Sequence, residues 1–251
     1  MPTYSNKNNK IYYNIYKSQK NAGNLLLIHD NGQSSKIFDS ELKFYTSYFN
    51  IMTVDLSGHG KSLTSLDKKN NFWISNAIAI SELCEKTKFK KFSVIGIGGG
   101  GLVALNIALI NPDIVKNIFA ESIPGLEPDL NYINSILQYR DDIKDSDKKN
   151  LFHTLNGTKW EKILDEDSAM LQTFTETGSS YLIGNPDQIN SRVLLAGSSG
   201  YDLIQDIEDK LRVMSGLFKK SQVHIFSAAK YPLIINKNHE YRTVTLNYLF
   251  D

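Results

Sequence analysis

The residues that could perform chemistry are concentrated around a run of four glycines, Gly98 to Gly101. An apolar, β-branched run, Phe92 to Ile97, comes before them and predicts a buried strand. An apolar stretch of helical length follows them and ends at Asn111-Pro112. A glycine turn between a strand and a helix can bind a phosphate or present a nucleophile. Either role would put the chemistry at the carboxyl edge of a parallel sheet.

Phosphate binding is suggested by a match to the dinucleotide pattern G-x-G-x-x-G. Gly96, Gly98 and Gly101 provide the three glycines, and Glu121 stands where a ribose-binding acid would follow the next strand. A lone match of this kind is weak evidence. Nucleotide binding at Gly96–Gly101 therefore stays a remote alternative.

A nucleophile turn of the form G-x-S-x-G also fits, with Gly96 and Gly100 flanking position 98. Other short patterns accompany it in order: His29 with Gly32, Asp55-x-x-Gly58-His59-Gly60-x-Ser62, and Asn111-Pro112-Asp113-x-Val115. With these landmarks the chain resembles the α/β-hydrolase superfamily over nearly its whole length. The resemblance implies an α/β fold with a mostly parallel central sheet, flanking helices and a helical cap inserted after the sixth strand.

The elements that must position the turn are predicted by their hydrophobic patterns. Residues 11–16 indicate a strand of an antiparallel hairpin, and Leu25 to Ile28 indicate a strand buried on both faces. A helix is expected over residues 36–48 and another from His239 to Phe250. The resemblance assigns the hydrolase core to residues 1–124 and 191–251 and the helical cap to residues 125–190.

The triad that the resemblance implies is missing from its usual positions. In that family a serine attacks the substrate, a histidine takes its proton and an acid orients the histidine. Gly98 stands at the serine position and Lys230 at the histidine position. The acid position falls on Gly200, or on Asp202 if the loop is longer. We therefore expect a pseudo-hydrolase, a non-catalytic protein that binds a small molecule or acts in regulation or interaction.

An active enzyme is the alternative from a different class. It would be an esterase-like hydrolase or a lyase, with a relocated active site or one based on Lys230 or Asp202. Serines at strand ends could supply a relocated nucleophile, although a loop serine is ordinarily a turn or cap residue. The serines concerned are Ser122, Ser198 and Ser199.

The turn could bind a ligand even without a serine. The backbone amide of Gly99 and one from the Asp30–Asn31 loop would point at the same spot, and Lys230 would add a positive charge. Such a site favours a carboxylate, a phosphate or a polarised carbonyl. Equally well, Lys230 could form an ion pair with Asp202 or Asp30 and bind no ligand. Asp30 could instead cap the turn in which it lies. The expected ligand-binding residues are His29, Asp30, Asn31, Gly98, Gly99 and Lys230.

Composition limits the remaining classes of function. The 251 residues carry a formal charge of +1 and 41% hydrophobic residues, which fits one domain and excludes a nucleic-acid binder on charge grounds. No apolar run is long enough to span a membrane, so a cytoplasmic protein is expected. The single cysteine, Cys84, excludes an intrachain disulfide and a cysteine-based metal site. We expect no cofactor, and as partners a small molecule or another protein.

Overall fold

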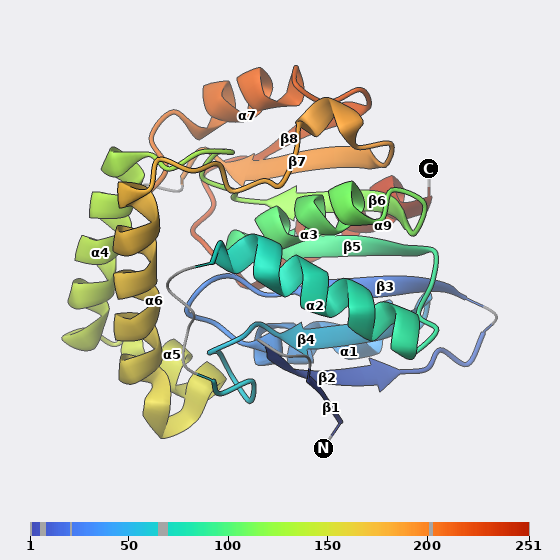
Figure 1. The fold of residues 1–251 in the computed structure, drawn as a ribbon, viewed down its shortest axis with the longest axis horizontal. Helices are drawn as coiled ribbons and strands as arrows, with labels where there is room; N and C mark the ends of the chain where they lie inside the picture. The colour runs from blue at the N-terminus through green and yellow to red at the C-terminus, as the bar shows by residue number, and fades with distance from the viewer. Residues whose placement is uncertain (1, 6–8, 21, 65–69, 201–202, 251) are drawn as a thin grey trace.

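The computed structural model describes residues 2–5, 9–20, 22–64, 70–200 and 203–250. Within these ranges, one sheet of eight strands in the order β1-β2-β4-β3-β5-β6-β7-β8 runs through the molecule, with helices on both faces (Figure 1). The strands from β4 to β8 in this order are parallel to their neighbours, whereas β2 is antiparallel to β1 and β4. The predicted α/β fold, with its mostly parallel sheet and opening hairpin, is thus confirmed.

The central strands are buried on both faces, as their apolar sequences predict. Leu25 to Ile28 in β3 are inaccessible to solvent, and all of β5 is buried. The strands are β1 (Thr3–Ser5), β2 (Lys10–Tyr16), β3 (Gly23–Ile28), β4 (Phe49–Asp55), β5 (Phe92–Ile97), β6 (Val115–Glu121), β7 (Arg192–Ser198) and β8 (Ser221–Phe226).

Helices cover the two faces through separate apolar clusters. One face carries α2 (Phe72–Lys86), α3 (Gly99–Ile110) and α7 (Ile207–Ser215), of which α2 and α3 lie in front of the sheet in Figure 1. The other face carries a 3-10 turn, η1 (Ser35–Phe38), with α1 (Asp39–Tyr45), α8 (Leu233–Asn236) and α9 (Asn238–Phe250). The helix expected over residues 36–48 is therefore this turn followed by α1, and it ends at Tyr45.

The helical insert lies between β6 and β7, at one end of the sheet (Figure 1). It contains α4 (Leu130–Lys144), α5 (Lys149–Asn156), η2 (Gly157–Lys159), α6 (Trp160–Glu176) and η3 (Pro186–Gln188). Apolar side chains of α4 and α6, such as Ile133 and Met170, join the main core cluster. The cap expected after the sixth strand is therefore present and packed onto the core.

No helix within the described ranges has both the length and the apolar character that crossing a lipid bilayer requires.

Candidate functional site

The turn between β5 and α3 has the geometry of a sharp strand-to-helix corner. Gly98 takes φ +50° and ψ −119°, a conformation that is strained for a residue with a side chain. A Cβ at Gly96 would overlap the Gly100 carbonyl, and one at Gly100 would overlap the Ile28 carbonyl. These glycines therefore allow the start of α3 to lie directly against β3 and β5.

The Asp30 carboxylate fills the space in front of this corner. Its Oδ1 accepts hydrogen bonds from the Gly99 amide at 2.6 Å and the Asn31 amide at 2.8 Å. Its Oδ2 accepts a hydrogen bond from the Tyr231 hydroxyl at 2.6 Å. A Cβ built on Gly98 would overlap the same carboxylate. Asp30 thus reaches, from the loop after β3, the place that a side chain at residue 98 would occupy.

The environment of Asp30 raises the pKa of its carboxyl group above the ordinary value of 3.8. Burial is the main cause, because an enclosed carboxylate loses its hydration. The hydrogen bonds from Tyr231, Gly99 and Asn31, together with the charge of Arg140, favour the ionised form and limit the rise. The result is a carboxylate that is more basic than an exposed one but retains strong hydrogen-bond donors.

The cap closes over this carboxylate and leaves very little free space. A cavity of about 20 Å³ remains beside Asp30, which is about the volume that one water molecule requires. Tyr132 and Ile136 of α4 and Leu171 of α6 line the cap side, while Trp73 lines the core side. In this arrangement of the cap, the space beside Asp30 is too small for an organic substrate.

A buried ionic cluster joins the cap to the loops around the site. Asp167 of α6 lies 2.6 Å from Arg140 of α4 and accepts a hydrogen bond of 2.6 Å from the Asn31 side chain. Its other neighbour is His59, whose Nε2 lies 3.2 Å from Asp167 Oδ1. Burial by itself would raise the pKa of Asp167, but the Arg140 guanidinium and the His59 contact hold it well below its usual range. The cluster therefore holds α6 against the loop that carries Asp30.

His29, one of the predicted ligand-binding residues, supports the loop instead of facing the cavity. Its Nε2 accepts a hydrogen bond from the Leu56 amide at 2.9 Å, so Nδ1 carries the proton and donates to the Asp30 carbonyl at 2.7 Å. Burial lowers the pKa of His29 to about 4, which keeps the ring neutral near pH 7. With both ring nitrogens engaged, His29 has no free base to offer a substrate.

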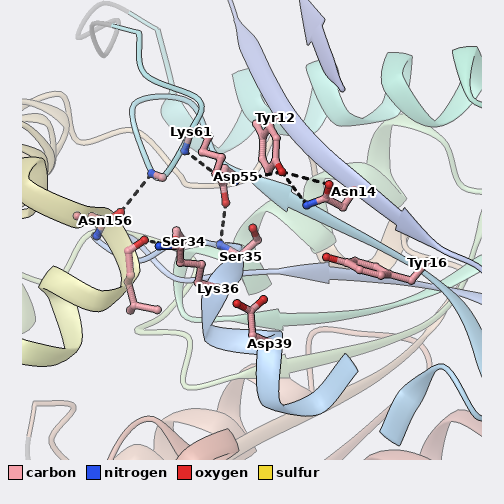
Figure 2. A pocket seen from close by; sticks show the side chains of 13 residues that line it. Tyr12, Asn14, Tyr16, Ser34, Ser35, Lys36, Asp39, Asp55, Lys61 and Asn156 are labelled. Carbon is pink, nitrogen blue, oxygen red and sulfur yellow. Dashed lines mark hydrogen bonds between the residues drawn. The ribbon is translucent and has the colours of Figure 1, made fainter. Parts of the chain in front are cut away.

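The pattern around Asp55 is structural as well. Figure 2 shows the Asp55 carboxylate accepting the Ser35 amide at 2.7 Å and the Lys61 amide at 2.8 Å. The Ser62 hydroxyl donates to the Asp55 carbonyl at 2.6 Å. These bonds hold the loop after β4 in place. Asp55, Ser35 and Lys61 also line a separate cavity of about 480 Å³ between β2, α1 and the base of the cap.

The positions equivalent to the histidine and the acid do not meet Asp30 as expected. Lys230 is exposed, and it is the next residue, Tyr231, that reaches the Asp30 carboxylate. The Gly200 amide donates to the Ser198 hydroxyl, and Asp202 lies outside the described residues. Of the predicted ligand-binding residues, the structure brings together Asp30, Asn31, Gly98 and Gly99.

Three features of the site were not predicted from the sequence. Tyr231 directly follows Lys230, the histidine-equivalent position, and this adjacency is the one feature of the sequence from which its place in the site could have been predicted. Gln33, whose side chain donates to the Tyr231 oxygen at 3.1 Å, lies in a loop without a pattern. The Asp167–Arg140 pair joins two cap helices, and its long sequence separation left no local pattern to find.

Within the described ranges, no histidine or carboxylate is hydrogen-bonded to the serines considered as relocated nucleophiles. Ser198 donates to the Ala229 carbonyl and accepts two backbone amides, and Ser199 accepts the Ala228 amide. Ser122 is buried and has φ +53°, but among the described residues its hydroxyl has no hydrogen-bond partner. None of the three is therefore activated by a neighbouring acceptor of the kind that serine catalysis needs.

The groups expected for nucleotide binding are engaged elsewhere. The start of α3, where a phosphate would bind, holds the Asp30 carboxylate. Glu121 is buried and accepts the Leu233 amide at 3.1 Å, so it does not face a ribose site. The glycine pattern is accounted for by the close packing of α3.

Comparisons with known proteins agree with this architecture. Residues 23–181 match the model of a family described as alpha/beta hydrolase fold. The enol-lactonase from Burkholderia xenovorans LB400 superposes with a TM-score of 0.77 at 11% identity and covers 100% of both chains, which shows a shared fold.

Two curated relatives carry the same name, pimeloyl-[acyl-carrier protein] methyl ester esterase. The protein from Wigglesworthia glossinidia brevipalpis is 30% identical over 146 residues, which are 54% of this chain and 53% of the relative. The protein from Proteus mirabilis (strain HI4320) is 28% identical over 133 residues, 49% of this chain and 48% of the relative. The chain therefore spans about half the length of the curated relatives it matches.

The expectation of a non-catalytic binding or regulatory protein is contradicted by these comparisons. Both curated relatives are named as esterases. That expectation rested on the residues at the three triad positions, Gly98, Gly200 or Asp202, and Lys230, whereas the structure places the Asp30 carboxylate where a side chain at residue 98 would lie.

Proposed function

Because the chain belongs to the alpha/beta hydrolase fold family, we propose that it is an ester hydrolase in which the Asp30 carboxylate takes the role of the absent serine. One observation carries this proposal. The carboxylate stands where the side chain of residue 98 would be, in contact with the amide at the start of α3. The names of the curated relatives support ester hydrolysis as the reaction class.

The two oxygens of Asp30 have different environments that suit different tasks. Oδ1 accepts the amides of Gly99 and Asn31, the kind of donor pair that stabilises an oxyanion. Oδ2 accepts a hydrogen bond from the Tyr231 hydroxyl. The raised pKa makes Oδ2 a stronger nucleophile than the oxygen of an exposed aspartate.

In the first step, Oδ2 attacks the carbonyl carbon of the ester after the cap has opened. The bond from this carbon to the alkoxy oxygen breaks, and the departing alkoxide takes the proton of the Tyr231 hydroxyl. Gln33 Nε2 donates to the Tyr231 oxygen at 3.1 Å and stabilises the phenolate that forms. The products are an alcohol and an anhydride between the acyl group and Asp30.

In the second step, water attacks Cγ of Asp30, and the negative charge develops on Oδ1. The amides of Gly99 and Asn31 already point at this oxygen. The bond from Cγ to the bridging oxygen then breaks and releases the carboxylic acid. One proton of the water returns to Tyr231 and the other leaves with the acid, so Asp30 is regenerated.

The route of the oxygen atoms tests this reaction. A single turnover of a short-chain ester with excess protein in water enriched in ¹⁸O should place the label in the peptide that carries Asp30, and the released acid should be unlabelled. Mass spectrometry of the digested protein measures both. The peptide with Asp39, an exposed aspartate outside the site, is the internal control and should stay unlabelled.

Two results would count against a nucleophilic Asp30. Label in the acid and none in the Asp30 peptide would mean that water attacks the ester directly. Labelling of Ser122 by a fluorophosphonate, with loss of activity, would mean that a serine is the nucleophile.

A further inference from the structure

A groove of about 980 Å³ lies between α7 and the two segments that connect the cap to the core. Residues 124–129 form one connecting segment, and residues 180–186 form the other. The volume falls in the range of small-molecule sites. Its apolar lining includes Leu126, Leu182, Ile183, Val213, Met214 and Leu217.

Several of these apolar side chains are exposed to water. Val213 is 74% exposed, Ile183 52% and Leu217 51%. The buried residues of α7 are Ile207, Leu211 and Met214, so Val213 and Leu217 lie on a different side of this segment from most of its core contacts. A contiguous exposed apolar patch of this kind is a typical binding surface.

The charges around the groove favour an uncharged occupant. Lys210 is paired with Asp129 at 2.7 Å, which neutralises the positive charge of that lysine. The other ionisable lining residues are the acids Glu127, Asp206 and Asp209. Negative charge would repel a free fatty acid or a phosphate, whereas an uncharged alkyl chain can pack against the apolar part of the lining.

The groove and the cavity at Asp30 share one wall. Pro124 lines both of them. Ser180 and Leu182 line the groove, while Tyr181, between them in the chain, lines the cavity at Asp30. The segments that separate the two spaces are the connections of the cap, so a cap movement that admits substrate acts on this wall.

We propose that the groove holds the unbranched apolar chain of the ester, with the ester group at Asp30 and the chain passing the wall formed by Pro124 and Tyr181. The inference rests on the proposed ester hydrolysis and makes it more specific. The preferred substrates are then uncharged esters with chains of medium length, and Val213, Leu217 and Ile183 determine the preference for chain length.

A series of p-nitrophenyl esters from acetate to decanoate tests the proposal. For the unaltered protein, kcat/KM should rise by about two- to fourfold with each methylene that the groove buries. In the double variant Val213→Glu and Leu217→Glu, the ratio of kcat/KM for decanoate to that for acetate should fall at least about tenfold. Both side chains are exposed, so the substitutions leave the folding core intact.

The matched control is Ile78→Glu, which also puts a carboxylate in place of an exposed apolar side chain, on α2 outside the groove. It should keep the chain-length dependence of the unaltered protein. An unchanged decanoate-to-acetate ratio in the double variant would overturn the inference. So would a dimer in solution that the double variant dissociates, because the groove would then be a contact between two copies.

A binding measurement separates this inference from the proposed reaction. Calorimetry with 2-undecanone and 2-pentanone, ketone analogues of methyl esters, requires no turnover. Tighter binding of the longer ketone, lost in the double variant and kept in Ile78→Glu, would support the groove even if no ester were hydrolysed. Equal binding of both ketones by the unaltered protein would overturn the groove assignment while leaving hydrolysis of short esters standing.

Discussion

The Asp30 carboxylate accepts the Gly99 amide at 2.6 Å, across the turn where residue 98 has no side chain. This hydrogen bond joins two segments that are 69 positions apart in the chain. In the proposed reaction the Asp30 carboxylate is the nucleophile, and the Gly99 amide at the start of α3 is an oxyanion donor. The predictions below test these two roles.

Tyr231→Phe should reduce kcat by about 100-fold, because the variant lacks the proton donor for the leaving alkoxide. Steady-state hydrolysis of p-nitrophenyl acetate and of an alkyl ester measures the effect. The loss should be smaller for the p-nitrophenyl ester, since p-nitrophenolate leaves without a proton. Tyr48→Phe, which removes the hydroxyl of a partly exposed tyrosine outside the site, is the control. Equal losses for both esters would argue against proton donation by Tyr231.

The pH profile should show the raised pKa of Asp30. The reaction needs the ionised carboxylate, so log kcat/KM should fall as the pH falls through a pKa above the ordinary value of 3.8. In the unaltered protein, the hydrogen bond from Tyr231 lowers the pKa of Asp30. Tyr231→Phe removes this bond, so the pKa should rise and the fall in log kcat/KM should begin at a higher pH. A limb that stays in place in this variant would show that another group controls the profile.

Asp167→Ala should lower the free energy of unfolding by about 3–5 kcal/mol, because it leaves the buried Arg140 guanidinium without its carboxylate. Urea unfolding measures this change. Glu208→Ala, which breaks the exposed pair with Arg212, should cost at most about 1 kcal/mol. Similar losses in the two variants would mean that the buried cluster does not hold the cap.

Glu121→Gln should change how stability depends on pH. Burial raises the pKa of Glu121 from 4.5 to about 7, so between these values the folded protein binds the proton more tightly than the unfolded chain. The contribution of this group to stability is complete below pH 4.5 and decreases by about 3 kcal/mol as the pH rises to 7. The glutamine still accepts the Leu233 amide and does not titrate.

Stability curves of both proteins from pH 4 to pH 8 check this prediction. Relative to the unaltered protein, the variant should become more stable as the pH rises through this window. His29 has the opposite effect, because its lowered pKa adds stability as the pH rises from about 4 to 6.5. This effect is the same in the unaltered protein and in Glu121→Gln, so it cancels when one stability curve is subtracted from the other. Parallel curves would contradict a buried, titrating Glu121.

Much of the fold could be predicted because it rests on local patterns. The apolar runs at Leu25–Ile28 and Phe92–Ile97 predicted buried parallel strands, and the structure confirms both. The glycine turn and the helix after it also follow from adjacent residues. These signals are contained within single elements, so one sequence is enough to recognise them.

The site was harder to predict because its contacts join distant segments. The amides of Gly99 and Asn31 were expected to meet, and they do, but the side chain that occupies their meeting point is Asp30 itself. The choice between Lys230 and Tyr231 as its neighbour depends on how the loop after β8 turns, which no short pattern encodes. The contact between Tyr231 and Asp30 joins residues 201 positions apart, so it could not be predicted from a local pattern.

The most direct test of the account is the esterase activity of Asp30→Asn beside that of the unaltered protein. Asparagine keeps the shape of the side chain and an acceptor for the Gly99 and Asn31 amides, so the fold should persist, as circular dichroism would verify. In Asp30→Asn, kcat/KM for p-nitrophenyl acetate should fall by at least about 10³-fold. A folded Asp30→Asn protein that hydrolyses the ester at the rate of the unaltered protein would contradict nucleophilic catalysis by Asp30.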